Sequence, residues 1–235
     1  TLKFIKSDPI QIPHLFSKKE DIEIAGFLAA TIAWGQRPTI IRNATFLMNT
    51  MDMAPYDFIL NFTNSDLEPF ANFKHRTFNF DDLQAFLFSL QNIYLNHGGL
   101  ESVFSHYPEN MAKNISYFKE TFFQTAHLSR TQKHVSDPMK GSAAKRLNMY
   151  LRWMVRQDKK GVDFGIWEQH NISDLMLPLD VHTGNVGRNL GLLNRKQNDW
   201  QAVEELTDAL RLYDPKDPVK YDFALFGIGV NKELL

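Results

Sequence analysis

The sixteen residues from Leu177 to Leu192 read LPLDVHTGNVGRNLGL and indicate how the C-terminal part of the chain folds. Pro178 has a fixed φ and biases the residue before it towards extended backbone, so the chain enters the next segment from a defined direction. Asp180 then stands at the N-cap position of a helix, where a carboxylate can accept from backbone N–H groups that lack a partner inside the helix. The stretch therefore predicts an extended lead-in, an aspartate cap and a helix over residues 181–190.

Composition limits the classes of protein to which the chain can belong. At 235 residues, with 43% hydrophobic and 23% charged residues, it resembles an ordinary globular protein that buries a sizeable core. No apolar run approaches ~20 residues, so we expect no membrane span. The absence of cysteine excludes disulfides, zinc–thiolate sites and thiolate-held iron–sulfur clusters, and it fits a cytoplasmic protein. The eight histidines form no metal-binding motif, and no phosphate-binding glycine loop is present, so we expect no metal and no cofactor.

Apolar residues recur at helical spacing along almost the whole chain, which predicts an all-α fold. The expected helices lie over residues 17–34, 38–48, 56–62, 65–70, 81–97, 100–106, 109–124, 143–157, 181–190, 200–212 and 218–228. No stretch shows sustained alternation with turns at hairpin spacing, so no sheet is predicted, although the aromatic-rich segment 70–80 can hold an irregular extended piece. We find no repeat or polar linker, and we expect residues 1–235 to form a single compact unit.

Positive charge is concentrated in one part of the chain. The formal net charge is −1, yet between Arg130 and Lys160 nine Lys or Arg residues face two Asp residues, so this stretch carries +7 and the rest of the chain −8. The nine are Arg130, Lys133, Lys140, Lys145, Arg146, Arg152, Arg156, Lys159 and Lys160. Such a stretch on an otherwise acidic protein indicates binding to a polyanion, and a solvated helix face is the alternative explanation.

A lysine-bearing helix lies inside this basic stretch, where residues 137–153 read DPMKGSAAKRLNMYLRW. Gly141 and Ser142 can begin a helix, with the Ser142 side chain as its cap. Lys145 would then lie near the positive end of the helix, which disfavours the protonated amine and favours a nucleophile. Lys145 can equally be a surface lysine on a basic helix.

Two further segments combine an aromatic ring with a polar side chain, as a pocket for a nucleobase requires. In residues 217–229, which read DPVKYDFALFGIG, Asp222 and Phe226 are four apart and share one face of a helix. Trp34 and Gln36 follow the first long helix, where tryptophan can stack on a base and glutamine can pair with its edge. Packing in the core is the alternative for both aromatic residues.

The stretch around Asp180 resembles the Val-Asp-x-His-x-x-Arg-Val run of the helix-hairpin-helix (HhH-GPD) DNA glycosylases, and the residue-level similarity extends over 137–229. The chain departs from most members, which carry Leu-Pro-Gly-Val-Gly-x-Lys before this helix. Here Pro138 is followed by Met139 and Lys140, and Lys145 lies 35 positions before Asp180. This arrangement is most similar to the archaeal 8-oxoguanine DNA glycosylase branch. The resemblance implies a two-lobed helical fold with a cleft between the lobes and a modified helix-hairpin-helix.

The resemblance also implies a set of residue roles. Lys145 would be the catalytic nucleophile, with Lys140 as the second choice, and Asp180 would be the catalytic acid that helps to deprotonate the lysine and stabilises the positive sugar. Asp222, Phe226, Gln36 and Trp34 would shape the base pocket. The residues expected to contact the nucleic acid are Lys140, Arg146, Arg152, His182 and Arg188.

These roles imply a base-excision repair enzyme that removes an oxidised purine such as 8-oxoguanine from double-stranded DNA. The lysine would form a Schiff base, so the enzyme would also be an AP lyase. We expect a monomer in the bacterial cytoplasm, at the nucleoid, without a cofactor or an iron–sulfur cluster. Two alternatives remain open, namely a non-catalytic nucleic-acid-binding helical module and a helical protein-interaction domain.

Overall fold

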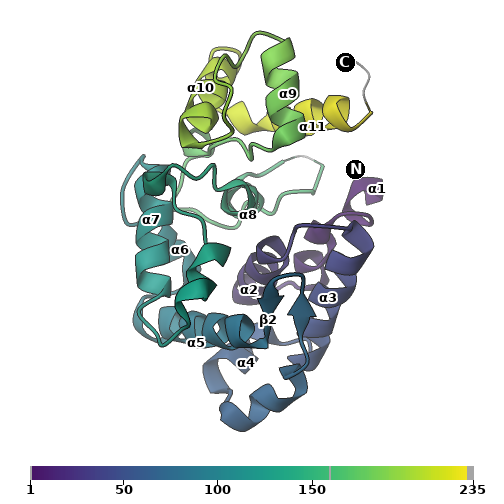
Figure 1. Cartoon of the computed structure of the whole chain (residues 1–235), viewed down its shortest axis with the longest axis vertical. Coiled ribbons are helices and arrows are strands. Elements are labelled where there is room, and N and C mark those ends of the chain that lie inside the picture. The colour runs from purple at the N-terminus through teal and green to yellow at the C-terminus, as the bar shows by residue number, and fades with distance from the viewer. Residues whose placement is uncertain (1, 159, 232–235) are drawn as a thin grey trace.

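The computed structural model describes residues 2–158 and 160–231, and it confirms the all-α prediction (Figure 1). The α-helices are α1 Leu2–Ile5, α2 Lys19–Thr31, α3 Arg37–Thr50, α4 Pro55–Asn61, α5 Phe80–Asn96, α6 Leu100–Phe104, α7 Met111–Phe122, α8 Lys145–Val155, α9 Val181–Asn189, α10 Trp200–Arg211 and α11 Asp222–Asn231. Short 3-10 helices are η1 Pro9–Gln11, η2 Pro13–Leu15, η3 Asn64–Phe70, η4 Ser129–His134, η5 Pro138–Lys140, η6 Ile172–Asp174 and η7 Pro218–Tyr221. The segment 70–80 holds one small antiparallel hairpin, formed by β1 Lys74–His75 and β2 Phe78–Asn79.

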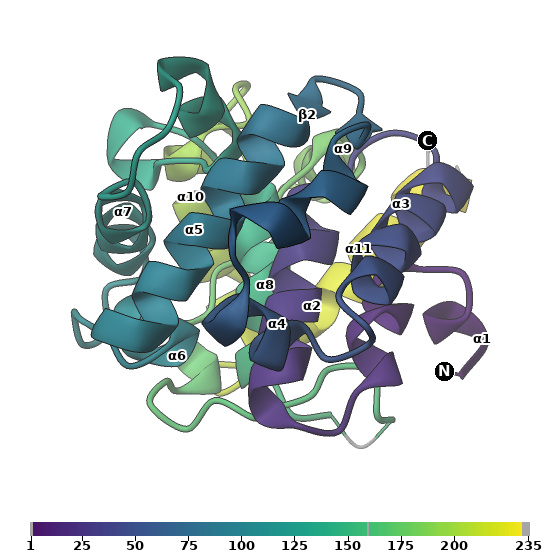
Figure 2. The same ribbon diagram turned by 90° about the horizontal axis from the view of Figure 1, so that it is seen from below.

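Helix α2 lies in the interior, among α3, α4 and α8, as Figure 2 shows from below. Every residue from Ile22 to Thr31 is buried. A helix that is apolar on all sides is stable only inside a core, because exposing any face would leave apolar surface in water. Buried apolar side chains from Ile10 to Leu225 join this helix in one cluster, so the same core supports both ends of the chain.

Helices α9, α10 and α11 gather at one end of the molecule, and α8 lies between them and α2 (Figure 1). Helix α9 packs directly on α11. Gly229 allows this close approach, because a Cβ at that position would lie 3.0 Å from both the Cβ and the carbonyl oxygen of His182. Asp180, directly before α9, and Asp222, at the start of α11, both pair with cations on α8.

The start of α8 differs from the prediction. Ser142 is not the N-cap, and the helix begins at Lys145 after Ala144, which has φ 46° and ψ 36°. The Ser142 hydroxyl accepts from the Ala144 N–H instead, and Ser142 forms a β-bridge with Asp199. A left-handed conformation is costly for a residue with a Cβ, so the surrounding structure must hold this turn in place. The result is that Lys145 is the first residue of its helix.

None of the helices that the structure describes combines the length and the apolar character that a membrane span requires.

Candidate functional site

Asp180 is the N-cap of α9, as its sequence context predicts. Its backbone is extended, with φ −124° and ψ −173°, and its Oδ1 accepts from the Thr183 N–H at 2.9 Å. The four preceding residues, Met176 to Leu179, are buried and fix the position of the cap. The second carboxylate oxygen, Oδ2, points to a different partner.

That partner is Lys145. Its Nζ lies 3.9 Å from Asp180 Oδ2, and the two side chains are 34% and 23% exposed. The lysine is the first residue of α8, at the end of the helix where backbone N–H groups lack partners within the helix. The two residues are 35 positions apart in the chain, so the tertiary fold creates the pair. Lys145 is partly accessible and forms an ion pair with Asp180, which suits an amine that must react.

Both side chains face one cavity of about 200 Å³. It is lined by Phe4, Asp8, Pro9, Ala33, Trp34, Gly35, Arg37, Ile40, Lys145, Met149, Arg152, Trp153, Pro178, Asp180, Asp222, Phe223 and Phe226. The lining comes from the N-terminal segment, the segment between α2 and α3, α8, the lead-in to α9 and the start of α11. Sites that enclose a drug-sized ligand measure ~300–1,000 Å³, so this cavity suits a smaller group such as a single base.

Three of the four residues predicted for a base pocket line this cavity, namely Trp34, Asp222 and Phe226. Asp222 is buried, and burial raises the pKa of its carboxyl while Arg152 opposes the shift. The fourth, Gln36, is the exposed N-cap residue of α3 and is not among the described residues lining the cavity, although its neighbours Gly35 and Arg37 are.

Arg152 is buried, whereas the sequence predicts that it contacts nucleic acid at the surface. Its side chain is only 4% exposed, and it donates to Asp163 at 3.3 Å and to Asp222. The guanidinium also lies 4.4 Å from the centre of the Phe223 ring. Arg152 therefore neutralises two buried acids at the cavity wall and orients the Asp222 carboxylate, so it supports the site and does not belong to an outer surface.

The structure also shows the surroundings of Arg146 and Arg188, which the sequence predicts as contacts to nucleic acid. Arg146 donates to the carbonyls of Thr31 and His134, lies 4.7 Å from the Trp34 ring, and has a pKa lowered to about 10 by burial. Arg188 donates to carbonyl oxygens in the loop that follows α9, including those of residues 195 and 196. Both guanidinium groups are thus engaged within the protein.

His182 and Lys140 remain at the surface. His182 is exposed, and its ring centre lies 6.2 Å from that of Phe226. Lys140 is 79% exposed, lies 4.0 Å from Asp137 Oδ2, and is not among the described residues that line the cavity. Of the two candidate nucleophiles, only Lys145 faces the cavity.

The basic stretch as a whole is less exposed than its charge indicates. Arg156 is buried, and its guanidinium contacts Asp158, Asp163 and Asp217. Arg130 contacts the buried Asp82 at 2.9 Å. Lys159 lies outside the described residues. Much of the +7 is therefore neutralised by acids from other parts of the chain.

Several residues of the cavity were absent from the sequence-based prediction. Phe4 and Phe223 pack edge to face, with ring centres 5.3 Å apart. Asp8 lies 4.0 Å from Arg37, and Arg37 lies 5.8 Å from the Phe226 ring centre. An Asp-Pro pair is a helix-start signal, so Asp8 could have been identified as the cap of η1, but its place in the cavity depends on the tertiary fold.

A second cavity of about 840 Å³ adjoins the first and shares Phe4, Arg37, Phe223 and Phe226 with it. Lys160 and Lys220 are also among its lining residues. The small cavity thus borders a larger hollow with aromatic and basic side chains.

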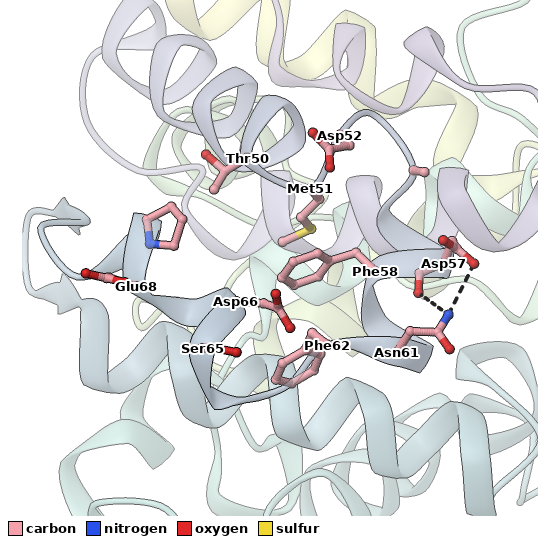
Figure 3. A pocket seen from close by; sticks show the side chains of 12 residues that line it. Thr50, Met51, Asp52, Asp57, Phe58, Asn61, Phe62, Ser65, Asp66 and Glu68 are labelled. Carbon is pink, nitrogen blue, oxygen red and sulfur yellow. Dashed lines mark hydrogen bonds between the residues drawn. The ribbon is translucent and has the colours of Figure 1, made fainter.

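A cavity of about 810 Å³ at α4 and η3 has the opposite charge (Figure 3). Its lining includes the acids Asp52, Asp57, Asp66 and Glu68, and no Lys or Arg is among the described residues that line it. Asn61 donates to Asp57, as the dashed lines in Figure 3 show. A negative surface of this kind repels a phosphate backbone, so the smaller cavity at Lys145 is the better candidate site for a polyanionic ligand.

Within residues 2–158 and 160–231, no group of three or more His, Cys, Asp or Glu side chains is arranged to hold a metal ion.

The arrangement at Lys145 combines an accessible amine, a carboxylate that can accept its proton, and a small pocket with aromatic and carboxylate groups. These parts define an all-α protein with a candidate site for amine chemistry on a flat, polar group. A family model described as "Protein of unknown function (DUF2400)" matches residues 8–231, so the chain belongs to the DUF2400 family. No curated protein and no solved structure matches the chain.

Proposed function

We propose that the protein is a DNA base-excision repair enzyme, a glycosylase with AP lyase activity that acts on an oxidised purine such as 8-oxoguanine in double-stranded DNA. The observation that carries the proposal is the Lys145–Asp180 pair at the cavity, with 3.9 Å between Nζ and Oδ2. The proposal includes a two-lobed arrangement in which α9–α11 and α2–α7 lie on either side of the site, with residues 137–229 as a modified helix-hairpin-helix.

The proposed reaction uses the amine as a nucleophile. Lys145 Nζ, deprotonated with help from Asp180, attacks the sugar C1′ of a nucleotide that has left the base stack. The new N–C1′ bond replaces the glycosidic bond, and the base leaves with the electron pair of that bond and takes up a proton. Opening of the sugar ring then gives a Schiff base between the lysine and C1′. Asp180 stabilises the positive charge that develops on the sugar.

The cavity supports the binding half of the proposal. Reading a flipped base requires a flat ring to stack on and polar groups that meet its edge. Phe223, Phe226 and Trp34 supply rings, and Asp222 supplies a polar group. The adjoining hollow, lined by Arg37, Lys160 and Lys220 among others, can receive the phosphates on either side of the flipped nucleotide.

The test is borohydride trapping on a duplex that contains 8-oxoguanine and on a duplex with an abasic site. Borohydride reduces the Schiff base to a stable amine, so the wild-type protein should give a covalent adduct with both. Lys145→Gln should give none. Lys140→Gln is the matched control, because Lys140 belongs to the same basic stretch but lies away from the cavity, and it should trap normally. Asp180→Asn keeps a good N-cap residue and should slow trapping by about 10²–10⁴-fold.

Each other outcome has a defined meaning. An adduct that persists in Lys145→Gln moves the nucleophile to Lys140 or another amine and overturns the assignment. A folded protein that binds DNA without forming an adduct overturns the lysine chemistry and leaves the non-catalytic nucleic-acid-binding module. A protein whose affinity for DNA is absent, or does not fall with salt, overturns both.

A further inference from the structure

The N-terminal segment contributes an acid to the cavity that has no role in the proposed reaction. Asp8 lines the cavity, and its side chain is 15% exposed. Its Oδ1 accepts from the Ile10 N–H at 3.1 Å and so caps η1. Its Oδ2 makes no hydrogen bond to a described residue, and the nearest cation, Arg37 Nη2, is 4.0 Å away. One oxygen of Asp8 therefore remains available to a ligand.

The surroundings of Asp8 limit what that ligand can be. The Phe4 and Phe223 rings and Pro9 line the same cavity and favour a flat group. Burial raises the pKa of the Asp8 carboxyl, while the Ile10 N–H and the charges of Arg37, Arg152 and Lys145 oppose the shift. A largely desolvated carboxylate with an unused acceptor gains most from an N–H donor, because it has lost much of its water without receiving a full set of hydrogen bonds.

Asp222 presents a second carboxylate to the same cavity, and Arg152 occupies one of its oxygens, Oδ2. With Asp180, which pairs with Lys145, three carboxylates line this small cavity, and they favour a ligand whose edge is rich in donors. Among purines, the Watson–Crick edge of a guanine-type base carries two neighbouring donors, N1–H and the exocyclic 2-amino group. An adenine-type base has an acceptor at N1, which a carboxylate disfavours.

We propose that Asp8 is a specificity-determining residue of this cavity, whose Oδ2 accepts a hydrogen bond from the exocyclic 2-amino group of a guanine-type base. The inference rests on the proposed function, because it takes the ligand to be a flipped base. It deepens that function by stating which edge of the base is read and by which residue of the N-terminal segment.

The test compares two bases that differ only in the 2-amino group. Duplexes carry 8-oxoguanine or 8-oxohypoxanthine on a 2′-fluorinated sugar, since the fluorine suppresses loss of the base and allows equilibrium binding to the wild-type protein. Fluorescence anisotropy at one fixed salt concentration gives the two Kd values. A hydrogen bond to a charged group predicts that 8-oxoguanine binds at least about 10-fold more tightly.

Two variants remove the carboxylate oxygen Oδ2 and keep one side-chain oxygen that can cap η1. Asp8→Asn and Asp8→Ser introduce residues that cap helices about as well as aspartate, so η1 should persist, and circular dichroism checks the fold. In both, the preference for 8-oxoguanine should fall to within about 3-fold, as expected when the hydrogen bond to the charged group is lost. Asp137→Asn is the matched control, because Asp137 caps η5 before Pro138 as Asp8 caps η1 before Pro9, yet it is not among the described residues lining the cavity. It should keep the wild-type ratio.

A wild-type ratio near one overturns the inference without any variant, and so does a wild-type ratio that survives in the folded Asp8 variants. These results differ from a failure of the proposed function. Failure of the lysine chemistry appears as a missing borohydride adduct, whereas failure of the Asp8 assignment appears as an unchanged affinity ratio in a protein that traps normally.

Discussion

Two of the three cations on helix α8 have opposite environments, Lys145 at its start and Arg152 two turns later. Lys145 is 34% exposed and has one acid at 3.9 Å, while Arg152 is 4% exposed and bonds two acids, Asp163 and Asp222. The first has the freedom that chemistry requires, and the second is fixed by the charges that it neutralises. The comparison teaches that a basic helix beside a candidate site need not present all of its cations to solvent or to a ligand.

The largest expected effect is on stability and comes from removing the positive charge at Arg152 or at Lys145. Arg152→Met leaves Asp163 and Asp222 buried with one cation fewer, and loss of one partner of a buried pair costs about 3–5 kcal/mol of the free energy of unfolding. Lys145→Gln should cost no more than about 0.5 kcal/mol, as for a surface substitution. Urea unfolding of both variants measures the difference. Equal destabilisation would break the comparison, because it would make Lys145 a structural cation as well.

Sequence reasoning identified what is encoded within a few residues. The cap at Asp180 and the helix after it follow from Pro178 and from the preference of aspartate for N-caps, and the structure confirms both. Lys145 was placed near a helix start by the same kind of signal, although the cap is Ala144 and not Ser142.

What could not be predicted depends on contacts between distant parts of the chain. The acids that pair with Arg152 lie 11 and 70 positions away in the chain. A count of charges over neighbouring residues does not include such partners, so it does not predict that this arginine is buried. Asp8 and Phe4 line the cavity although they lie near the other end of the chain from α11. Hydrophobic periodicity predicts which residues are helical, but it does not say which helix ends meet.

A second comparison concerns buried acids around α8. Asp163 has Arg152 and Arg156 as partners, whereas Glu23 on α2 accepts from neutral donors, the Tyr94 hydroxyl and the Trp167 indole N–H, each at 2.7 Å. Burial raises the pKa of Glu23 to about 6 from an ordinary 4.5, and these two hydrogen bonds only partly oppose the shift.

This difference predicts a pH effect with a definite sign. Between pH ~4.5 and ~6 the folded protein binds more protons at Glu23 than the unfolded chain does, so the contribution of Glu23 to stability is complete below that window and is lost as the pH rises through it. The loss is about 2 kcal/mol.

Glu23→Gln removes this contribution and keeps an acceptor for the Tyr94 hydroxyl. The difference in the free energy of unfolding between variant and wild type should therefore shift by about 2 kcal/mol in favour of the variant between pH 4.5 and 7.5. Using the difference cancels groups common to both proteins, such as His134, whose pKa is lowered to about 4 by burial and which acts in the opposite direction. A difference that does not change with pH would mean that Glu23 is ionised in the folded protein at acidic pH as in the unfolded chain.

The smallest expected effect separates the cations of the basic stretch that the proposed function brings to DNA from those that it does not. Lys160 is exposed and lines the hollow next to the Lys145 cavity, while Lys133 is also exposed, on η4, and is not among the described residues lining either cavity. Each phosphate that a lysine neutralises contributes about 0.9 to the slope of log affinity against log salt. Lys160→Gln should reduce the magnitude of that slope by about 1, and Lys133→Gln should leave it unchanged. A salt titration of duplex binding with both variants decides the matter. If the two lysines contribute equally, the basic stretch binds DNA as a diffuse patch, and the border of the Lys145 cavity has no special part in positioning the phosphates.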